Sequence, residues 1–141
     1  MIVEVTRRAH FCAGHRYWRP EWSLAKNREV FGACANEHGH GHNYTVEVTL
    51  SGPVDPVTGM VINLTEVDRL IQAHVIERLD HKNLNIDVLE LAGRVPTTEV
   101  LAGFVWDQLV SRVTVGRLIR VRVCESEDLW AERGLAGEAT S

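Results

Sequence analysis

Residues 40–50 alternate between polar and apolar side chains, and this pattern limits the possible folds more than any other feature of the sequence. The apolar positions are Tyr44, Val46, Val48 and Leu50. Because successive side chains of a strand point to opposite faces, we predict a strand with one buried face. Residues 2–15 alternate in the same way, although Arg7 interrupts their apolar side.

The other predicted helices and strands follow from changes in the spacing of the apolar residues along the chain. Proline and glycine in residues 51–59 end the second strand in a turn. Helical spacing then runs from Asn63 to residue 79 and again after Pro96, where a threonine can cap the helix. Residues 117–125 alternate once more, and a shorter strand is expected over 128–133. Residues 16–39 are irregular, with a short helix near 23–30.

This order of elements is strand, strand, helix, helix, strand, strand, and it predicts an α+β fold. Two helices would then cover one face of a four-stranded antiparallel sheet. No internal repeat or linker is visible, so we predict one domain over residues 1–133. Residues 134–141, rich in small side chains, are expected to form a disordered tail.

Composition excludes several classes of protein. The net charge of −4 argues against a nucleic-acid-binding protein, which needs a basic surface. No apolar run is long enough to span a membrane, and no signal peptide is visible at the N-terminus. The three cysteines are far apart, which does not resemble a disulfide framework. We therefore expect a cytoplasmic protein.

The histidines indicate a metal site. His40 and His42 are two residues apart on a predicted strand, so both imidazoles point to one face. His15 ends the apolar side of the first strand, and His38 shares the parity of His40 and His42, so either can supply a third ligand. Three neutral imidazoles suit zinc with an open fourth position, while nickel, copper and iron remain alternatives. A solvated histidine-rich turn that binds metal adventitiously is the competing interpretation.

Residues 31–44 read Phe-Gly-Ala-Cys-Ala-Asn-Glu-His-Gly-His-Gly-His-Asn-Tyr, with a cysteine six residues before the first histidine of His-Gly-His-Asn-Tyr. This run resembles the signature of the 6-pyruvoyl-tetrahydropterin synthase family. Residues 59–64, 79–84, 96–99 and 124–125 carry four further family motifs in the same order. The resemblance covers residues 9 to 130 and implies a T-fold: ββααββ subunits that close a barrel, as a homo-hexamer built from two trimers.

The resemblance also implies roles for individual residues. It selects His15, His40 and His42 as the zinc ligands and leaves His38 outside the site. Further residues take these roles in the family pattern: Cys34 as general base, Asp80 and His81 as an acid/base pair, Glu125 as the pterin anchor, and Thr98 and Glu99 near the pterin or a subunit contact. Alternative interpretations are a small buried thiol for Cys34, a helix C-cap for Asp80–His81 and simple helix capping for Thr98–Glu99.

The implied reaction converts 7,8-dihydroneopterin triphosphate to 6-pyruvoyl-tetrahydropterin with loss of triphosphate, so the expected ligand is a small pterin triphosphate. The close rival is the 6-carboxy-tetrahydropterin synthase of the queuosine pathway, in which the cysteine usually lies closer to the histidines. The sequence also leaves open an aldolase acting on dihydroneopterin and a non-enzymatic metal-binding protein.

Arg16, Lys26 and Arg28 are candidates for binding the triphosphate by position alone. Val100 departs from the family pattern, as does the Phe-Cys-Ala-Gly-His sequence that ends at His15.

Overall fold

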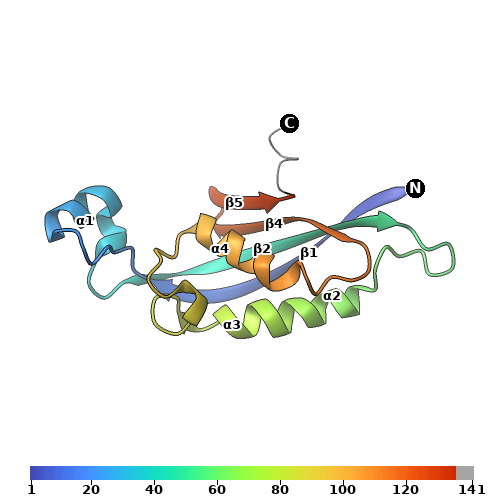
Figure 1. The fold of residues 1–141 in the computed structure, drawn as a ribbon, viewed down its shortest axis with the longest axis horizontal. Coiled ribbons are helices and arrows are strands. Elements are labelled where there is room, and N and C mark those ends of the chain that lie inside the picture. Colours follow the sequence, from blue (N-terminus) through green and yellow to red (C-terminus); the bar gives the residue numbers. More distant parts are fainter. Residues whose placement is uncertain (136–141) are drawn as a thin grey trace.

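The computed structural model describes residues 1–135, and its strands and helices follow the predicted order (Figure 1). The strands are β1 (Ile2–His15), β2 (His40–Pro53), β3 (Lys82–Asn83), β4 (Arg117–Ser126) and β5 (Leu129–Gly134). The helices are α1 (Leu24–Phe31), α2 (Leu64–Ile71), α3 (Glu77–Leu79) and α4 (Thr98–Leu109). A π-helical segment, Gln72–Ile76, joins α2 to α3, so residues 64–79 form one continuous helical run.

The sheet has the strand order β3-β1-β2-β4-β5. β1, β2, β4 and β5 pair antiparallel, as predicted. The prediction of a four-stranded sheet was incomplete, because β3 adds a fifth strand that pairs parallel to β1 at Ala13 and Gly14. β2 also continues to Pro53, beyond the predicted end at residue 50. The extension is possible because Ser51 and Gly52 still pair with β1.

The helices cover one face of the sheet, with α2 and α3 against β1 and α4 against β4 and β5. Figure 1 shows α1 apart from them, at one end of the molecule. α4 begins where Thr97 accepts a hydrogen bond from the backbone N–H of Val100, which confirms the predicted threonine cap. No helix within residues 1–135 is long and apolar enough to cross a bilayer.

The core lies between the helices and the apolar face of the strands. It includes Tyr44, Val46, Val48 and Leu50, the alternating positions of β2, all of which are buried. Arg7 interrupts this face of β1 because its guanidinium forms a bidentate contact with Asp68 of α2, with Nε–Oδ1 and Nη2–Oδ2 distances of 2.6 and 2.8 Å. Two parallel hydrogen bonds fix both side chains at the rim of the core.

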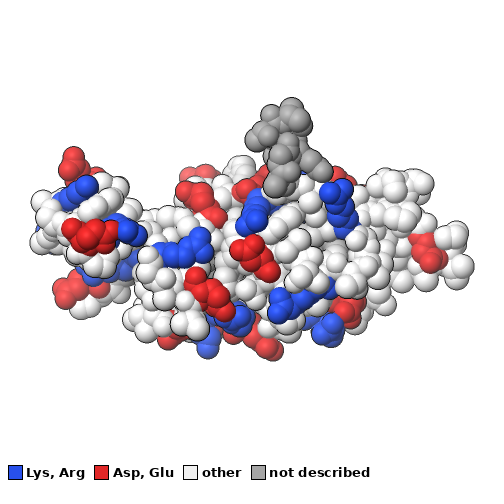
Figure 2. All heavy atoms as spheres, viewed as in Figure 1, with Lys and Arg blue, Asp and Glu red and all other residues white. Residues whose placement is uncertain are grey.

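Charged side chains of both signs are mixed on one face of the molecule. On the face seen in Figure 2, basic and acidic groups lie side by side rather than in separate patches. Two ion pairs involve the helical run 64–79. One joins Arg69 to Glu66, and the other joins Arg78 to Glu90. β5 ends at Gly134, one residue past the predicted domain boundary, and residues 136–141 of the predicted tail lie outside the described part.

Candidate functional site

Three histidines meet at the end of the helix-facing side of the sheet. The antiparallel register places His15 opposite His40 and Ala13 opposite His42, so all three imidazoles share one face. One nitrogen from each ring lies within 4.8 Å of the others, and the Nε2 atoms of His15 and His40 are 3.1 Å apart. His38 is exposed and lies outside this histidine cluster. The two-residue spacing of His40 and His42 and the register of β1 against β2 therefore bring His15, His40 and His42 together.

The surroundings of His15 favour a neutral imidazole. It is buried, and its Nδ1 lies 2.8 Å from the hydroxyl of Tyr44. An Nδ1–H that donates to this hydroxyl leaves the Nε2 lone pair directed at the cluster. Burial lowers the pKa of His15 to about 4. The ring is therefore uncharged at neutral pH, as metal binding requires.

His42 provides the clearest indication that the cluster fits a metal ion. Its Nε2 is buried and has no hydrogen-bond partner among the described residues. The Oε1 atom of Glu125 is 2.8 Å away, but the contact does not have the geometry of a hydrogen bond. A buried nitrogen without a partner is costly, and a cation shared with two other imidazoles would satisfy it.

Glycines behind the cluster let the backbone come close. Gly39 has a φ of +69°, and a Cβ there would lie 2.6 Å from the carbonyl oxygen of His15. At Gly41 a Cβ would lie 3.2 Å from the carbonyl oxygen of Ala13. Both positions therefore favour a residue without a side chain, and the glycines allow His40 and His42 to stand beside His15.

Cys34 lies beside the cluster. It sits in the 3₁₀ turn Gly32–Ala35, with its Sγ 3.9 Å from Nε2 of His40. The carbonyl of Cys34 accepts a 2.8 Å hydrogen bond from the N–H of Tyr17, which ties this turn to the chain that follows β1. Partial burial, with a smaller effect from the charge of Glu125, raises the pKa of the Cys34 thiol. A thiolate at this position needs a positive charge nearby.

Glu125 forms the opposite wall of the site. It lies at the end of β4 on the same face as Tyr44, as its parity predicts, and its side chain is 10% exposed. The Thr98 hydroxyl, at the start of α4, donates a 2.8 Å hydrogen bond to Oε2. The Tyr17 hydroxyl is 3.5 Å from the same oxygen. Glu99 follows Thr98 but is exposed and makes no hydrogen bond or ion pair within residues 1–135.

Asp80 and His81 pair with each other, with Oδ2 and Nδ1 2.9 Å apart. The Oδ1 atom of Asp80 accepts a hydrogen bond from the backbone N–H of Cys12, which lowers the pKa of this carboxyl together with the contact to His81. His81 has a positive φ of 59°, and its side chain is 81% exposed. No hydrogen bond or ion pair in the described chain joins this pair to Cys34 or to the histidine cluster.

Sequence reasoning missed two tyrosines of the site. Tyr44 was interpreted as a core residue of the strand, yet its hydroxyl positions His15. Tyr17 lies in the irregular segment, and its ring packs 4.7 Å from that of His15 while its hydroxyl approaches Glu125. The position of Tyr44 two residues after His42, on the same face of the strand, was the available signal for its role.

The comparisons with known proteins agree with this geometry. The family model described as 6-pyruvoyl tetrahydropterin synthase matches residues 4–134. The chain belongs to this family. It is 53% identical over 108 residues to the 6-pyruvoyl tetrahydrobiopterin synthase of Drosophila melanogaster, and the match covers 77% of this chain but 64% of that protein, just under two thirds. It is 43% identical over 126 residues to the human protein of the same name, covering 89% and 87% of the two chains.

A solved member of the family has the same fold. The 6-pyruvoyl tetrahydropterin synthase of Caenorhabditis elegans superposes with a TM-score of 0.89 at 34% identity, over 96% of this chain and 97% of that one. A 6-pyruvoyl tetrahydropterin synthase structure from Plasmodium vivax, at 17% identity and a TM-score of 0.67, shares the fold alone. The resemblance read from the sequence motifs is therefore confirmed along nearly the whole chain.

Proposed function

We propose that this chain is a metal-dependent 6-pyruvoyl-tetrahydropterin synthase, a lyase that converts 7,8-dihydroneopterin triphosphate to 6-pyruvoyl-tetrahydropterin and releases triphosphate. One observation carries the proposal: a histidine cluster lies between a thiol and a largely buried carboxylate. Sγ of Cys34 is 3.9 Å from His40, and Oε1 of Glu125 is 2.8 Å from His42. The names of the relatives support the same activity.

Zinc is the ion that we propose for the cluster. His15, His40 and His42 would hold it through imidazole nitrogens, the ligands that suit zinc, and a fourth position would stay open. When bound, zinc would supply Lewis-acid catalysis and make the hydroxyls of the pterin side chain more acidic. Its positive charge near Cys34 would also favour the thiolate.

Glu125 is proposed to hold the pterin ring. A carboxylate can accept two parallel hydrogen bonds from the amino-pyrimidinone edge of a pterin, as it does from a guanidinium. The hydrogen bond from Thr98 fixes the plane of the carboxylate, because α4 holds the hydroxyl in place. The ring would then lie on the His42 side of the cluster, with its side chain directed at the histidines.

Proton transfer is proposed for Cys34 and for the Asp80–His81 pair. Sγ of Cys34 lies 3.9 Å from Nε2 of His40, so the thiolate could take a proton from a carbon of a substrate bound at the cluster. Within one chain, Asp80 and His81 contact the backbone of Cys12 instead. We propose that they act at the site of a neighbouring subunit, which would require a homo-oligomer.

The strand edges support such an oligomer. β3 covers only Ala13 and Gly14 of β1, and β5 pairs with β4 alone within the described residues. The backbone of Cys12 is bonded to Asp80 and His81, but the rest of the outer edge of β1 and the outer edge of β5 could pair with another copy, as in subunits that close a barrel. We therefore propose trimers that close a barrel and stack into a hexamer.

Product analysis tests the proposed function. Metal-loaded protein is incubated with 7,8-dihydroneopterin triphosphate, and the pterin product is identified by mass spectrometry. We expect a 6-pyruvoyl product together with inorganic triphosphate, and we expect turnover to stop when a chelator removes the metal. A 6-carboxy product would assign the chain to the queuosine-type reaction, and unchanged substrate would contradict the enzyme proposal.

Replacing Glu125 by glutamine is expected to weaken pterin binding by about ten- to a hundred-fold. The glutamine side chain would keep the shape of the glutamate but lose its charge, and hydrogen bonds to charged groups contribute about 1.5–3 kcal/mol. Binding is measured by quenching of neopterin fluorescence. The matched control is Glu127→Gln, because Glu127 is exposed two residues farther along the chain. Equal affinities of the Glu125→Gln variant and the wild type would contradict the anchor role.

A further inference from the structure

Tyr17 contacts three parts of the site, although the proposed reaction gives it no role. Its backbone N–H donates a 2.8 Å hydrogen bond to the carbonyl of Cys34. Its ring centre lies 4.7 Å from that of His15, and its hydroxyl is 3.5 Å from Oε2 of Glu125. The turn that carries the thiol, the histidine cluster and the carboxylate therefore all border on this one residue.

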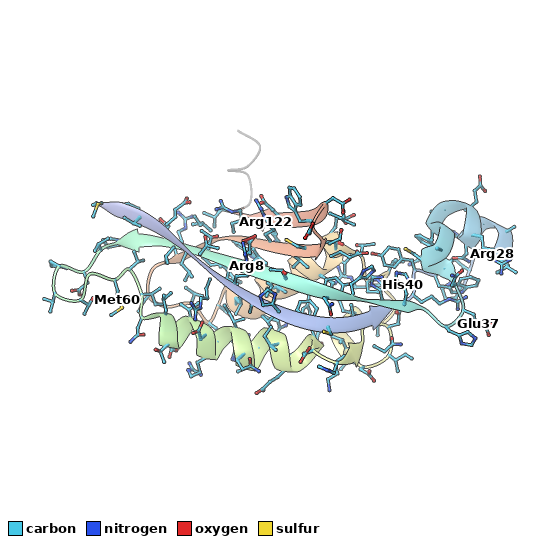
Figure 3. The ribbon with its side chains drawn as sticks, turned by 180° about the vertical axis from the view of Figure 1, so that it is seen from behind. Arg8, Arg28, Glu37, His40, Met60 and Arg122 are labelled. Carbon is cyan, nitrogen blue, oxygen red and sulfur yellow. The ribbon has the colours of Figure 1, made fainter. Side chains whose placement is uncertain are left out.

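The ring of Tyr17 is held by two aromatic neighbours. It packs on the imidazole of His15 at an interplanar angle of 43°. It also meets Phe31, the last residue of α1, edge to face with ring centres 5.9 Å apart, and Phe31 stacks in turn on Trp22. Figure 3 shows α1 at the same end of the sheet as His40. Because these contacts restrict the ring, its hydroxyl loses little conformational entropy when it binds a ligand.

Two hydroxyls approach Oε2 of Glu125, and only one of them is fully engaged there. Thr98 is buried and donates at 2.8 Å, the usual length of such a bond. Tyr17 is only partly buried, and its 3.5 Å contact is longer than the about 2.5–3.0 Å of an ordinary O–H···O hydrogen bond. Its hydroxyl has no other hydrogen bond within residues 1–135. The O–H of Tyr17 is therefore available to a ligand at Glu125.

The pterin edge that Glu125 is proposed to hold is complementary to this hydroxyl. The edge offers two donors, the 2-amino group and N3–H, which pair with the carboxylate. The two atoms that flank these donors, O4 and N1, are both acceptors. A tyrosine hydroxyl, with an ordinary pKa of about 10, is protonated at neutral pH and carries one O–H donor. A hydroxyl beside the carboxylate therefore meets an acceptor on either flank of the edge.

We propose that Tyr17 is a further pterin-binding residue, whose hydroxyl donates a hydrogen bond to the acceptor, O4 or N1, that flanks the edge held by Glu125. The inference rests on the proposed function, because it takes the pterin ring to be at Glu125. The carboxylate binds the two donors of the ring, and the hydroxyl binds one acceptor beside them. A ring with a donor at that flank leaves the hydroxyl unpaired, so Tyr17 favours pterins over heterocycles with another pattern.

Removing this hydroxyl alone tests the proposal. Tyr17→Phe keeps the ring that packs on His15 and loses only the O–H. We expect the affinity of metal-loaded protein for neopterin, measured by fluorescence quenching, to fall about three- to ten-fold, the effect of one hydrogen bond. Metal affinity should not change. Tyr44→Phe removes the other tyrosine hydroxyl of the site, which contacts His15, and should lower metal affinity instead, since that hydroxyl supports a ligand.

Two pterin analogues identify the acceptor. In 4-thiopterin a sulfur, which is a weaker acceptor, replaces O4, and in 1-deazapterin a C–H group replaces N1. The wild type should bind one of these analogues more weakly than it binds pterin, and this difference should shrink about three- to ten-fold in Tyr17→Phe. Differences that are the same in both proteins, for both analogues, would overturn the proposal.

Two other results would also overturn it. The first is an unchanged affinity of Tyr17→Phe for neopterin. The second is a loss of metal from Tyr17→Phe equal to that from Tyr44→Phe, because the hydroxyl would then act through the histidine cluster. Failure of the wild type to bind neopterin would overturn the proposed function itself. Neopterin binding that is weakened by Glu125→Gln but not by Tyr17→Phe would overturn the role of Tyr17 alone.

Discussion

Replacing Cys34 by alanine is expected to lower kcat by about 10²- to 10⁴-fold, the usual contribution of a general base. Sγ of Cys34 is 3.9 Å from Nε2 of His40, close enough to reach a substrate bound at the histidine cluster. The cluster is complete without it, since three imidazoles already converge there. Metal content and neopterin affinity should therefore stay at wild-type values while turnover is lost.

Cys124→Ala is the matched control for this substitution. Cys124 is also partly buried with a raised thiol pKa, but it lies on β4 opposite Thr45, on the face away from the cluster. The control should turn over substrate at the wild-type rate. Wild-type turnover by the Cys34→Ala protein would exclude Cys34 as the base, and loss of its metal would show that Cys34 is a ligand instead.

Replacing His40 by alanine is expected to lower metal affinity by more than about 100-fold. Changing a residue that only supports a metal ligand typically costs about 10- to 100-fold, so loss of a ligand should cost more. His40 stands between His15 and Cys34, with its Nε2 3.1 Å from that of His15. Metal content is measured after dialysis against a competing chelator, and turnover should fall in parallel.

His38→Ala controls for the loss of a neighbouring imidazole. His38 shares strand parity with His40 and lies two residues away, but it is exposed and outside the cluster. This variant should keep its metal. Loss of metal from the His38→Ala protein, with retention in the His40→Ala protein, would mean that the histidine-rich turn and not the cluster is the binding site.

The sequence specified the faces of the strands but not how the strands align. Alternation alone placed His40 and His42 on one face, and it placed Glu125 on the side of the core. It left His15 and His38 as equal candidates, because the choice depends on the register of β1 against β2. That register results from pairing between residues distant in the sequence, such as His15 with His40.

Several further features depended on similarly distant contacts. Arg7 interrupts the apolar pattern of β1, and its partner Asp68 lies on α2, far away in the sequence. β3 is two residues long, too short to produce a periodic pattern. The distance from Cys34 to His40 also had no local signal, because the intervening residues form a turn whose path is set by contacts such as that between Tyr17 and Cys34.

Diffraction from crystals grown with zinc and neopterin tests the central claim most directly. Anomalous data at the zinc edge should show one peak per chain, at about 2.0–2.1 Å from a nitrogen of each of His15, His40 and His42. The amino-pyrimidinone edge of the pterin should lie against the carboxylate of Glu125. A zinc peak at other residues, or a pterin bound away from Glu125, would contradict the proposed site.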